Sequence, residues 1–384
     1  MLLHLLLVLI KVFSEQKSRL EFFRSFLHFF GCLAAIFVIG FLVIYPIYQY
    51  HTLNYPPEKQ VSDSRFLLST FGFKPAADLV IFLADKPVIR AYSQYFLGLL
   101  MVFQRASFGH TTYFMGEVSA SGWKIYFPFV YLIKETLSFH LLTLISVITA
   151  LCALIASHRK NSFLKEPLNR LRDWLKNHLA ETAMLLFIAI YWATSLKSNL
   201  NIGVRHLLPT IPLVIVLVSG TIWQWLANNR FQRLKTLLVA VLIAWQAISI
   251  FRVYPYFLAY ANELVGGPDK LYNYTVDSNL DWGQDLKRLS QWLEKNEISK
   301  VYVDYFGGSN INYYLGEKAI PWQETNKAKD FPKGNYLAVS ATLLQAGRGK
   351  LAPGSKEQSG YYLWLNQYQP IAKIGYSIFI YYID

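Results

Sequence analysis

The sequence predicts a mainly α-helical polytopic membrane protein with a C-terminal extracytoplasmic α/β domain. Hydrophobic residues make up 54% of the chain and charged residues only 16%. Apolar runs close to the length that crosses a hydrocarbon core recur up to about residue 254, and short helix and strand signals follow them. We therefore expect a membrane domain at residues 1–254 and an α/β domain at residues 255–384.

Five apolar runs are predicted to be membrane spans. They lie at residues 27–48, 137–157, 182–196, 207–227 and 236–254. The third run is short, because a helix rises only about 1.5 Å per residue, so it must recruit flanking residues to cross.

The N-terminal run, MLLHLLLVLIKVF, stays apolar only as far as Ile10. It carries no positive charge before its apolar core and no small-residue cleavage site after it, so it does not fit a signal peptide. We interpret it as the cytoplasmic end of a further span whose beginning is missing from this chain.

The net charge of +13 is concentrated in the membrane half. Lys and Arg outnumber Asp and Glu by 24 to 11 over residues 1–254, whereas both counts are 13 over residues 255–384. Most of the excess lies in short loops at 11–24, 158–181 and 228–235, which the positive-inside rule keeps in the cytoplasm. We therefore expect a multi-pass protein of the cell (inner) membrane, and no nucleic-acid partner, because no compact basic face remains.

With the basic loops inside, the region at about 49–130 becomes an external loop. It holds an amphipathic stretch at 88–103, whose aromatic and aliphatic residues recur at helical spacing. This stretch is either a helix in the membrane interface or a packed helix of the external region. Lys134 and Glu135 follow, and we expect them at the outer boundary as mutual partners, because charges inside the bilayer are costly.

The C-terminal region has the pattern of a small α/β domain. Asp281 and Gln284 form a helix-start pattern, and apolar residues at helical spacing continue to Leu293. A turn is predicted at 307–310 and a Gly-, Lys- and Ser-rich loop at 347–360. Strands are predicted at 301–306, 336–343, 361–365 and 377–383.

No metal site or disulfide framework is predicted. Cys32 and Cys152 both lie inside apolar runs. The His and carboxylate residues lack the close spacing of a dedicated metal site, so a divalent metal requirement stays open and no cofactor is assigned.

The segment NIGVRHLLP at 201–209 places a cation and an imidazole at the mouth of a predicted span. Arg205 offers a planar fork of donors and His206 can donate from either ring nitrogen, which suits an anionic phosphate at the water–lipid boundary. The alternative is that both side chains are interfacial anchors.

Three blocks, in order, resemble one family of membrane enzymes. They are GHTTYFMGEVSASGWKIYFPFVYLIKETLSFHLL at 109–142, NIGVRHLLPTIPL at 201–213 and YFLAYANELVGGPDKLYNYTVDSNLDWGQDLKRL at 256–289. Together they resemble the C-terminal half of bacterial membrane glycosyltransferases of the protein O-mannosyltransferase type, which form glycosyltransferase family 39 and its relatives within the GT-C superfamily. The resemblance extends from about residue 105 to about residue 315.

This resemblance implies a GT-C-like helical membrane domain with its active site at the outer face. Such enzymes take a sugar linked to a polyprenyl phosphate in the membrane and move it to a glycan, lipid or protein acceptor outside. By resemblance, Arg205 and His206 hold the donor phosphate. Supporting roles in the site are implied for the other matched residues, which are His110, Glu117, Asp277, Asn279, Asp281, Trp282 and Gln284.

Several of these residues also fit simpler roles. Asp281 is either a general base or a helix cap, Asp277 is either a site residue or part of a turn, and Trp282 either stacks on a sugar or packs against the membrane domain. In the family the acidic catalytic residue lies in the first external loop, before the matched region. We therefore expect the base to be absent from this chain, which is then a truncated product, one half of a split enzyme or an inactive relative.

Two other functions are weighed against sugar transfer. One is a non-catalytic membrane protein whose external α/β domain binds an envelope partner or a glycan. The other is a transporter, which is disfavoured because charged residues are scarce in the spans. His140 is the main exception, and a single His on an apolar helix usually packs.

Overall fold

The computed structural model describes residues 10, 19–160, 167–228, 230–355 and 358–384. The predicted N-terminal run apart from Ile10, and the basic residues Lys11, Lys17 and Lys165, lie outside these residues. The chain forms two compact units, one of residues 1–108 with 162–187 and one of residues 109–161 with 188–384. Each unit is described by itself.

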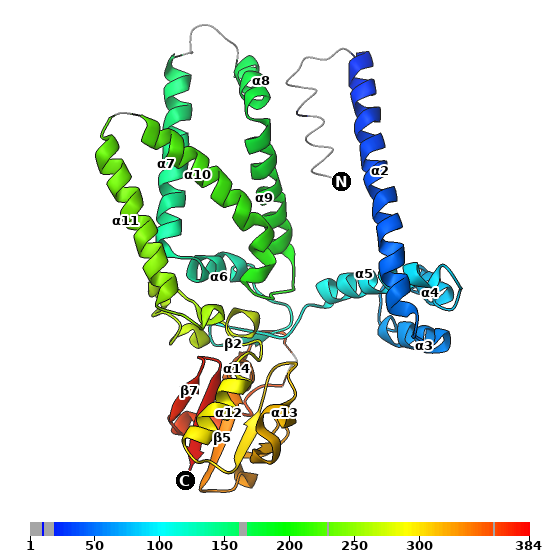
Figure 1. The fold of residues 1–384 in the computed structure, drawn as a ribbon, viewed down its shortest axis with the longest axis vertical. Helices are drawn as coiled ribbons and strands as arrows, with labels where there is room; N and C mark the ends of the chain where they lie inside the picture. The colour runs from blue at the N-terminus through cyan, green and yellow to red at the C-terminus, as the bar shows by residue number, and fades with distance from the viewer. Residues whose placement is uncertain (1–9, 11–18, 161–166, 229, 356–357) are drawn as a thin grey trace. The chain divides into compact units, whose positions relative to one another are not determined.

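Among the described residues, five helical segments are long and apolar enough to cross a membrane. They are α2 (Arg19–Thr52), α7 (Leu137–Lys160), α9 (Leu179–Lys197), η1 with α10 (Val204–Thr210 and Ile211–Ala227) and α11 (Gln232–Phe251) (Figure 1). Each coincides with one predicted span, and the short third run does recruit flanking residues at both ends. Few of their residues are fully buried in the protein, as expected if these helices face lipid.

The first unit contains α2 together with shorter helices. These are α3 (Pro57–Leu67), α4 (Lys74–Leu83), α5 (Arg90–Phe108) and α8 (Pro167–Asn177). The predicted helix at 88–103 is confirmed as α5, where Ser93 Oγ donates to the Val80 carbonyl at 2.7 Å. The ring of Tyr92 lies 5.4 Å from that of Tyr45 of α2, centre to centre, at a tilt of 40°. α5 is therefore packed along one side, while Val102 and Phe103 stay exposed.

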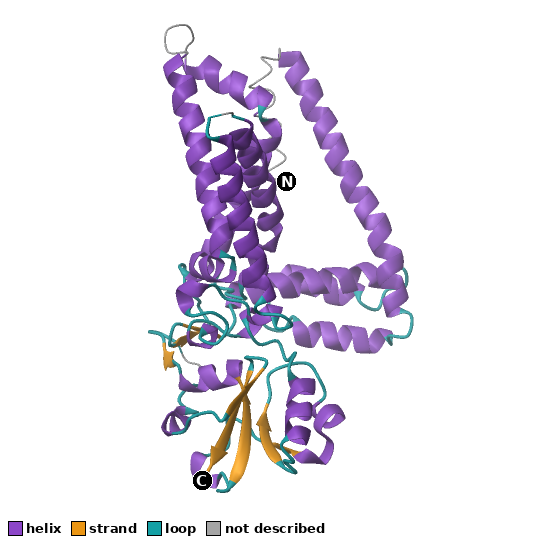
Figure 2. Ribbon diagram, turned by 60° about the vertical axis from the view of Figure 1, so that its left-hand side comes forward, coloured by secondary structure: helices purple, strands orange, loops and turns teal. Residues whose placement is uncertain are grey.

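In the second unit, α10 and α11 pack against α7. Figure 2 distinguishes the helices of the fold from its strands by colour. Leu142 of α7 meets Val218 and Ile222 of α10 and Leu242 of α11 in one apolar cluster. The short helix α6 (Tyr126–Lys134) precedes α7 and is buried along one side. Its last residue, Lys134, donates from Nζ to the carbonyls of Leu258 and Asn279. The ammonium group is therefore stabilised by backbone oxygens as well as by the nearby charge of Glu135.

The second unit also holds two β-sheets. The smaller sheet has the order β1-β2-β6, in which β1 (Thr112–Phe114) and β2 (Glu117–Ser119) form a hairpin and β6 (Lys350–Leu351) runs parallel to β2. The pairing of β2 with β6 attaches the hairpin to the C-terminal region, with Val118 opposite Leu351. The paired residues are more than 230 positions apart in the sequence.

The larger sheet has the order β4-β3-β5-β8-β7. Its strands are β3 (Val301–Asp304), β4 (Ala319–Pro321), β5 (Asn335–Ser340), β7 (Ala372–Ile374) and β8 (Ile378–Ile383). β3 is parallel to both β4 and β5, and β8 is antiparallel to β5 and β7. The sheet is thus mixed, as in many α/β domains.

Helices cover both faces of this sheet. α12 (Leu286–Lys295) buries Leu286, Leu289 and Leu293 against one face, as its apolar spacing predicts. α14 (Ala341–Arg348) buries Leu344 in the cluster on the other face, and α13 (Ile311–Leu315) follows β3. The remaining elements are short 3₁₀ helices at Phe257–Ala259, Glu263–Val265, Leu271–Asn273, Asp277–Asn279, Gly316–Lys318, Ala328–Asp330 and Leu363–Gln367.

The predicted strands are confirmed at β3, β5 and β8, with two corrections. The strand predicted at 336–343 ends at Ser340, because α14 begins at Ala341. The strand predicted at 361–365 is wrong, because this segment leads into the 3₁₀ helix η8 (Leu363–Gln367). Tyr362 and Leu365 are its buried residues, and their spacing of three matches a 3₁₀ turn and not the two-residue repeat of a strand.

Leu289→Ala should destabilise the α/β domain by about 2–5 kcal/mol, because the side chain is fully buried between α12 and the sheet. Thermal unfolding of the purified full-length chain measures the effect. Lys287→Ala, on the exposed side of the same helix, is the matched control and should leave the unfolding midpoint nearly unchanged. Equal midpoints for the two variants would contradict this packing.

Candidate functional site

The segment before α10 is bonded directly to the DSNLDWGQD segment. The Val204 backbone N–H donates to Asn279 Oδ1 at 2.9 Å, and Ser278 Oγ donates to the Ile202 carbonyl. Gly203 lies between these bonds with φ of +90°. A Cβ at this position would lie 2.6 Å from Ser278 Oγ, so both the backbone conformation and the close approach require glycine.

The Asn279 side chain is fully buried and holds this junction together. Its Nδ2 donates to the Tyr126 hydroxyl at 2.9 Å and to Thr275 Oγ1 at 2.8 Å, while its Oδ1 accepts from Val204. Its own backbone carbonyl accepts from Lys134 Nζ at 2.6 Å. Asn279 therefore positions the site from behind and does not face a substrate.

This junction places Arg205 against Trp282. The Arg205 guanidinium carbon lies 4.2 Å from the centre of the indole ring, a cation–π contact, and its Nε donates to the Ile202 carbonyl at 3.0 Å. Trp282 is 56% exposed, so it does not simply pack against the protein. Gln284 supports the loop that carries this indole. Its Oε1 accepts from the backbone N–H of Trp282 at 2.8 Å, and its Nε2 donates to the Leu280 carbonyl at 2.9 Å.

His206 has different neighbours from Arg205. Its ring lies 5.2 Å from that of Phe127 and 5.6 Å from that of Tyr191, centre to centre, and the Tyr191 hydroxyl donates to the His206 carbonyl at 2.8 Å. The two residues are adjacent in sequence, but only Arg205 contacts the exposed indole.

Asp281 does not begin the following helix, so the helix-start prediction is wrong. α12 begins at Leu286, and Asp281 is fully buried. Its Oδ1 accepts from the Gly283 N–H at 3.2 Å and its Oδ2 from the Thr342 N–H at 3.1 Å. Burial raises the pKa of Asp281 to about 7 despite these bonds. The carboxyl group therefore links the loop to the start of α14 and is closed to substrate.

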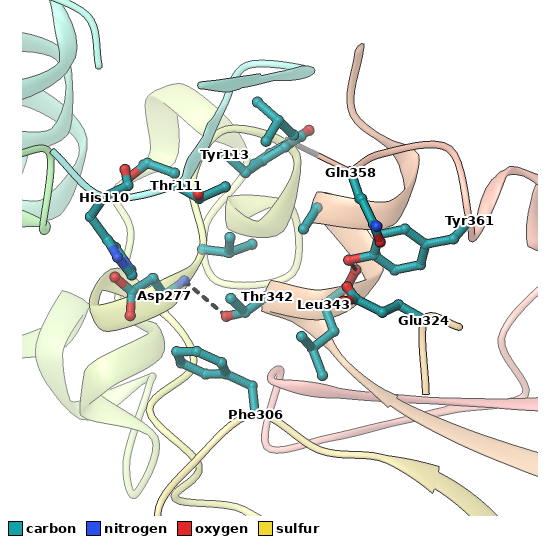
Figure 3. Close-up of a pocket in the computed structure, with 14 residues that line it drawn as sticks. His110, Thr111, Tyr113, Asp277, Phe306, Glu324, Thr342, Leu343, Gln358 and Tyr361 are labelled. Atoms are coloured by element: carbon teal, nitrogen blue, oxygen red, sulfur yellow. Dashed lines mark hydrogen bonds between the residues drawn. The ribbon is translucent and has the colours of Figure 1, made fainter. Parts of the chain in front are cut away.

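A cavity of about 460 Å³, lined by both polar and apolar residues, lies beside this segment (Figure 3). His110 and Asp277 line one side of it, and Glu324 and Tyr361 line the other side. Asp277 has a φ of +52°, which is unusual for a residue other than glycine, and its N–H donates to Thr342 Oγ1 at 3.0 Å. Strained backbone of this kind is often found at binding sites.

A second, more open hollow of about 620 Å³ adjoins this cavity. It lies beside Trp282 and is also lined by Tyr305, Gly307 and Gly308. Phe306 and Leu343 line both hollows, so the surface near the Arg205–Trp282 pair continues towards His110 and Asp277.

The structure thus brings some of the predicted site residues together and separates others, among them His206, whose neighbours are given above. Arg205, Trp282 and Gln284 come together at one place, and His110 and Asp277 at the adjoining cavity. Asn279 and Asp281 are buried supports, as described above. Glu117 is exposed on β2, and its Oε2 accepts from Trp123 Nε1 at 3.3 Å, away from the cavity lining.

Sequence reasoning missed the cavity residues Phe306, Glu324, Thr342 and Tyr361. They lie in segments that showed only strand, loop or turn signals, and no motif in the sequence marks them. Among the described residues, no group of three or more His, Cys, Asp or Glu side chains could hold a metal ion.

Comparisons of this chain with family models, with curated proteins and with solved structures find no match. The resemblance to membrane glycosyltransferases is therefore a prediction from the sequence blocks alone.

Asn279→Ala should destabilise the second unit, because it leaves the Val204 N–H and the Tyr126 hydroxyl without their buried partner. Each such loss costs about 1–3 kcal/mol. Thermal unfolding of the full chain is the measurement, and Asn312→Ala, at an exposed position of α13, is the control. A midpoint as high as that of the control would show that the junction does not depend on this amide.

The stability of the fold should fall as pH rises from about 4 to about 7, in part because of Asp281. The pKa of this carboxyl is raised from 3.8 to about 7 in the folded chain. In that window the folded state keeps a proton that the unfolded chain has released, so the contribution is complete below the unfolded pKa and is lost as pH approaches 7.

Unfolding midpoints of the wild type and of Asp281→Asn, measured across this pH range, isolate the contribution. The variant should be less stable at low pH, because its amide replaces an acceptor of the Thr342 N–H, and its midpoint should depend less on pH. Parallel pH profiles would contradict the raised pKa.

Proposed function

We propose that this chain is a multi-pass membrane glycosyltransferase, or the donor-binding part of one. In this proposal it takes a sugar from a polyprenyl-phosphate donor and passes it to an acceptor at the outer face of the cell (inner) membrane. The observation that carries the proposal is the Arg205 guanidinium, which lies over an exposed indole at the start of a helix apolar enough to span a membrane.

The chemistry of this pair suits a lipid-linked sugar phosphate. Stacking uses the face of a guanidinium, whereas phosphate binding uses its edge, so Arg205 can do both at once. When the glycosidic bond to the phosphate breaks, negative charge develops on the departing phosphate, and a fixed cation stabilises it. Trp282 offers an aromatic ring against which the sugar can pack. Because Arg205 lies at the start of a helix apolar enough to span a membrane, the isoprenoid chain of the donor can remain in the lipid while its phosphate is bound.

The proposed orientation is supported by the basic loops, because the positive-inside rule predicts that the N-terminal end of α10 and the C-terminal domain lie outside the cytoplasm. His206 is a secondary phosphate ligand in this proposal, because its ring packs against Phe127 and Tyr191. Asp281 is not the general base, because its oxygens are buried and bonded. Asp277 is the carboxylate of the DSNLDWGQD segment that lines the cavity beside His110.

A second candidate function is a non-catalytic membrane protein whose α/β domain binds a glycan or an envelope partner. The cavity beside His110 and Asp277 favours it, because the carboxylates and aromatic rings that line this cavity can bind a glycan without any transfer reaction. This candidate predicts no role for Arg205.

Arg205→Ala should weaken the binding of a polyprenyl phosphate by about 10- to 100-fold, the effect of losing a charge-assisted, bidentate contact. Arg205→Lys should fall between this variant and the wild type, because an ammonium keeps the charge and loses the fork. Titration of the short-chain polyprenyl phosphate into the full chain in phospholipid nanodiscs measures the affinity.

Arg233→Ala is the matched control, since it removes a cation from a loop predicted to be cytoplasmic. Unchanged binding in Arg205→Ala would reject the phosphate role and favour the non-catalytic function.

A further inference from the structure

We propose that the cavity between His110, Asp277, Glu324 and Tyr361 is a saccharide-binding site, separate from the phosphate-binding role of Arg205. Saccharide binding there deepens the second candidate function, in which the α/β domain binds a glycan, and does not depend on sugar transfer. Four properties of the cavity support it: its hydrogen-bonding groups, the absence of Lys and Arg from its described lining, its size and its attached walls.

The lining supplies the groups that sugars need. Asp277 and Glu324 are carboxylates on opposite sides of the cavity, and each can accept hydrogen bonds from neighbouring hydroxyl groups (Figure 3). Phe306 and Tyr361 add aromatic surface, against which the C–H face of a sugar ring can pack. His110 offers a further polar group beside Asp277.

The charge of the lining disfavours an anionic ligand. No Lys or Arg is among the described residues that line the cavity. Two backbone donors at the start of α14 are already bonded, since Thr342 N–H donates to Asp281 Oδ2 at 3.1 Å and Ala341 N–H to the Ser377 carbonyl at 2.7 Å. A phosphate would therefore meet two carboxylates with no Lys or Arg among the described lining residues to offset their charge. A neutral ligand that is rich in hydroxyl groups is therefore favoured over an anionic one.

The size and access of the cavity fit a ligand of one or two sugar rings. Its volume of about 460 Å³ lies in the range of small-molecule sites. Asp277 is 9% exposed, whereas Glu324 is exposed, so the cavity runs from an open mouth to a buried wall.

The walls are held in place before any ligand arrives. The hairpin wall is tied to the C-terminal region by the pairing of Val118 with Leu351. On the opposite wall, the Tyr361 hydroxyl donates to the Leu343 carbonyl at 3.4 Å. Such preorganisation lowers the entropic cost of binding.

The cavity adjoins the hollow beside Trp282 through Phe306 and Leu343. A saccharide bound in the cavity is therefore placed as the acceptor of the sugar, an assignment that does rest on the proposed function.

Methyl glycosides of glucose, galactose, mannose and N-acetylglucosamine, and disaccharides of these sugars, are suitable probes. Their binding to the full chain is measured by saturation-transfer NMR and calorimetry in phospholipid nanodiscs. Glycoside detergents must be avoided, because their sugar head groups would occupy the same site. At least one probe should bind at millimolar concentration or tighter.

Two variants of the cavity test the assignment. Ala346→Leu fills the cavity without removing a polar group and should weaken binding at least tenfold. Glu324→Gln should weaken it about tenfold, as expected for the loss of a charge-assisted hydrogen bond. The matched controls are Glu317→Gln and Ala328→Leu, at exposed positions of the same domain that do not line the cavity, and both should bind like the wild type.

The proposal is overturned if no probe binds, if both cavity variants bind like the wild type, or if inorganic phosphate binds and competes with the glycosides.

The Arg205→Ala variant tests whether the phosphate site and the saccharide site are separate. It should lose the polyprenyl phosphate and keep the glycoside, whereas loss of both ligands would show that there is one shared site. Glycoside binding that survives a failed polyprenyl phosphate test would leave a saccharide-binding protein and reject the transferase.

Discussion

The buried amide of Asn279 is the contact on which the site depends. It joins the backbone at Val204, at the start of a membrane-type helix, to a segment 75 positions later in the sequence. Because the amide is fully buried, each of its hydrogen bonds would cost free energy to break, and no water can replace them. The position of Arg205 over Trp282 follows from this junction, so a hydrogen bond within the protein sets the geometry of the exposed pair.

Burial separates residues that look equivalent in the sequence. The DSNLDWGQD segment supplies three acidic groups, and two of them, Asp281 and Asp285, are fully buried. Asp285 is paired with Arg288 and accepts from Ser377 Oγ at 2.7 Å. Of these three, only Asp277 lines the cavity beside His110, whereas Trp282 and Gln284 of the same segment are exposed. A motif of this kind is therefore mostly a scaffold that presents a few groups for chemistry.

Two kinds of binding chemistry lie next to each other on this scaffold. Arg205 and Trp282 offer a cation and an aromatic face, which suit a phosphorylated sugar. The adjoining cavity offers carboxylates and aromatic rings, with no Lys or Arg among the described residues of its lining, which suits neutral hydroxyl groups. The strand pairing of β2 with β6 contributes to this division, because it fixes the wall that carries His110 beside the domain that carries Glu324.

The sequence by itself determined the elements whose signal is local. Five apolar runs became five helices, because hydropathy and helix length are properties of a continuous segment. The strands β3, β5 and β8 were also predicted, whereas β4 and β7 were missed because three residues carry little periodicity. Arg205 was found from its residue type and its place beside a span. Its contact with Trp282, the burial of Asp281 and the joining of Glu324 to Asp277 were decided by the tertiary structure, because each depends on packing between segments far apart in the chain.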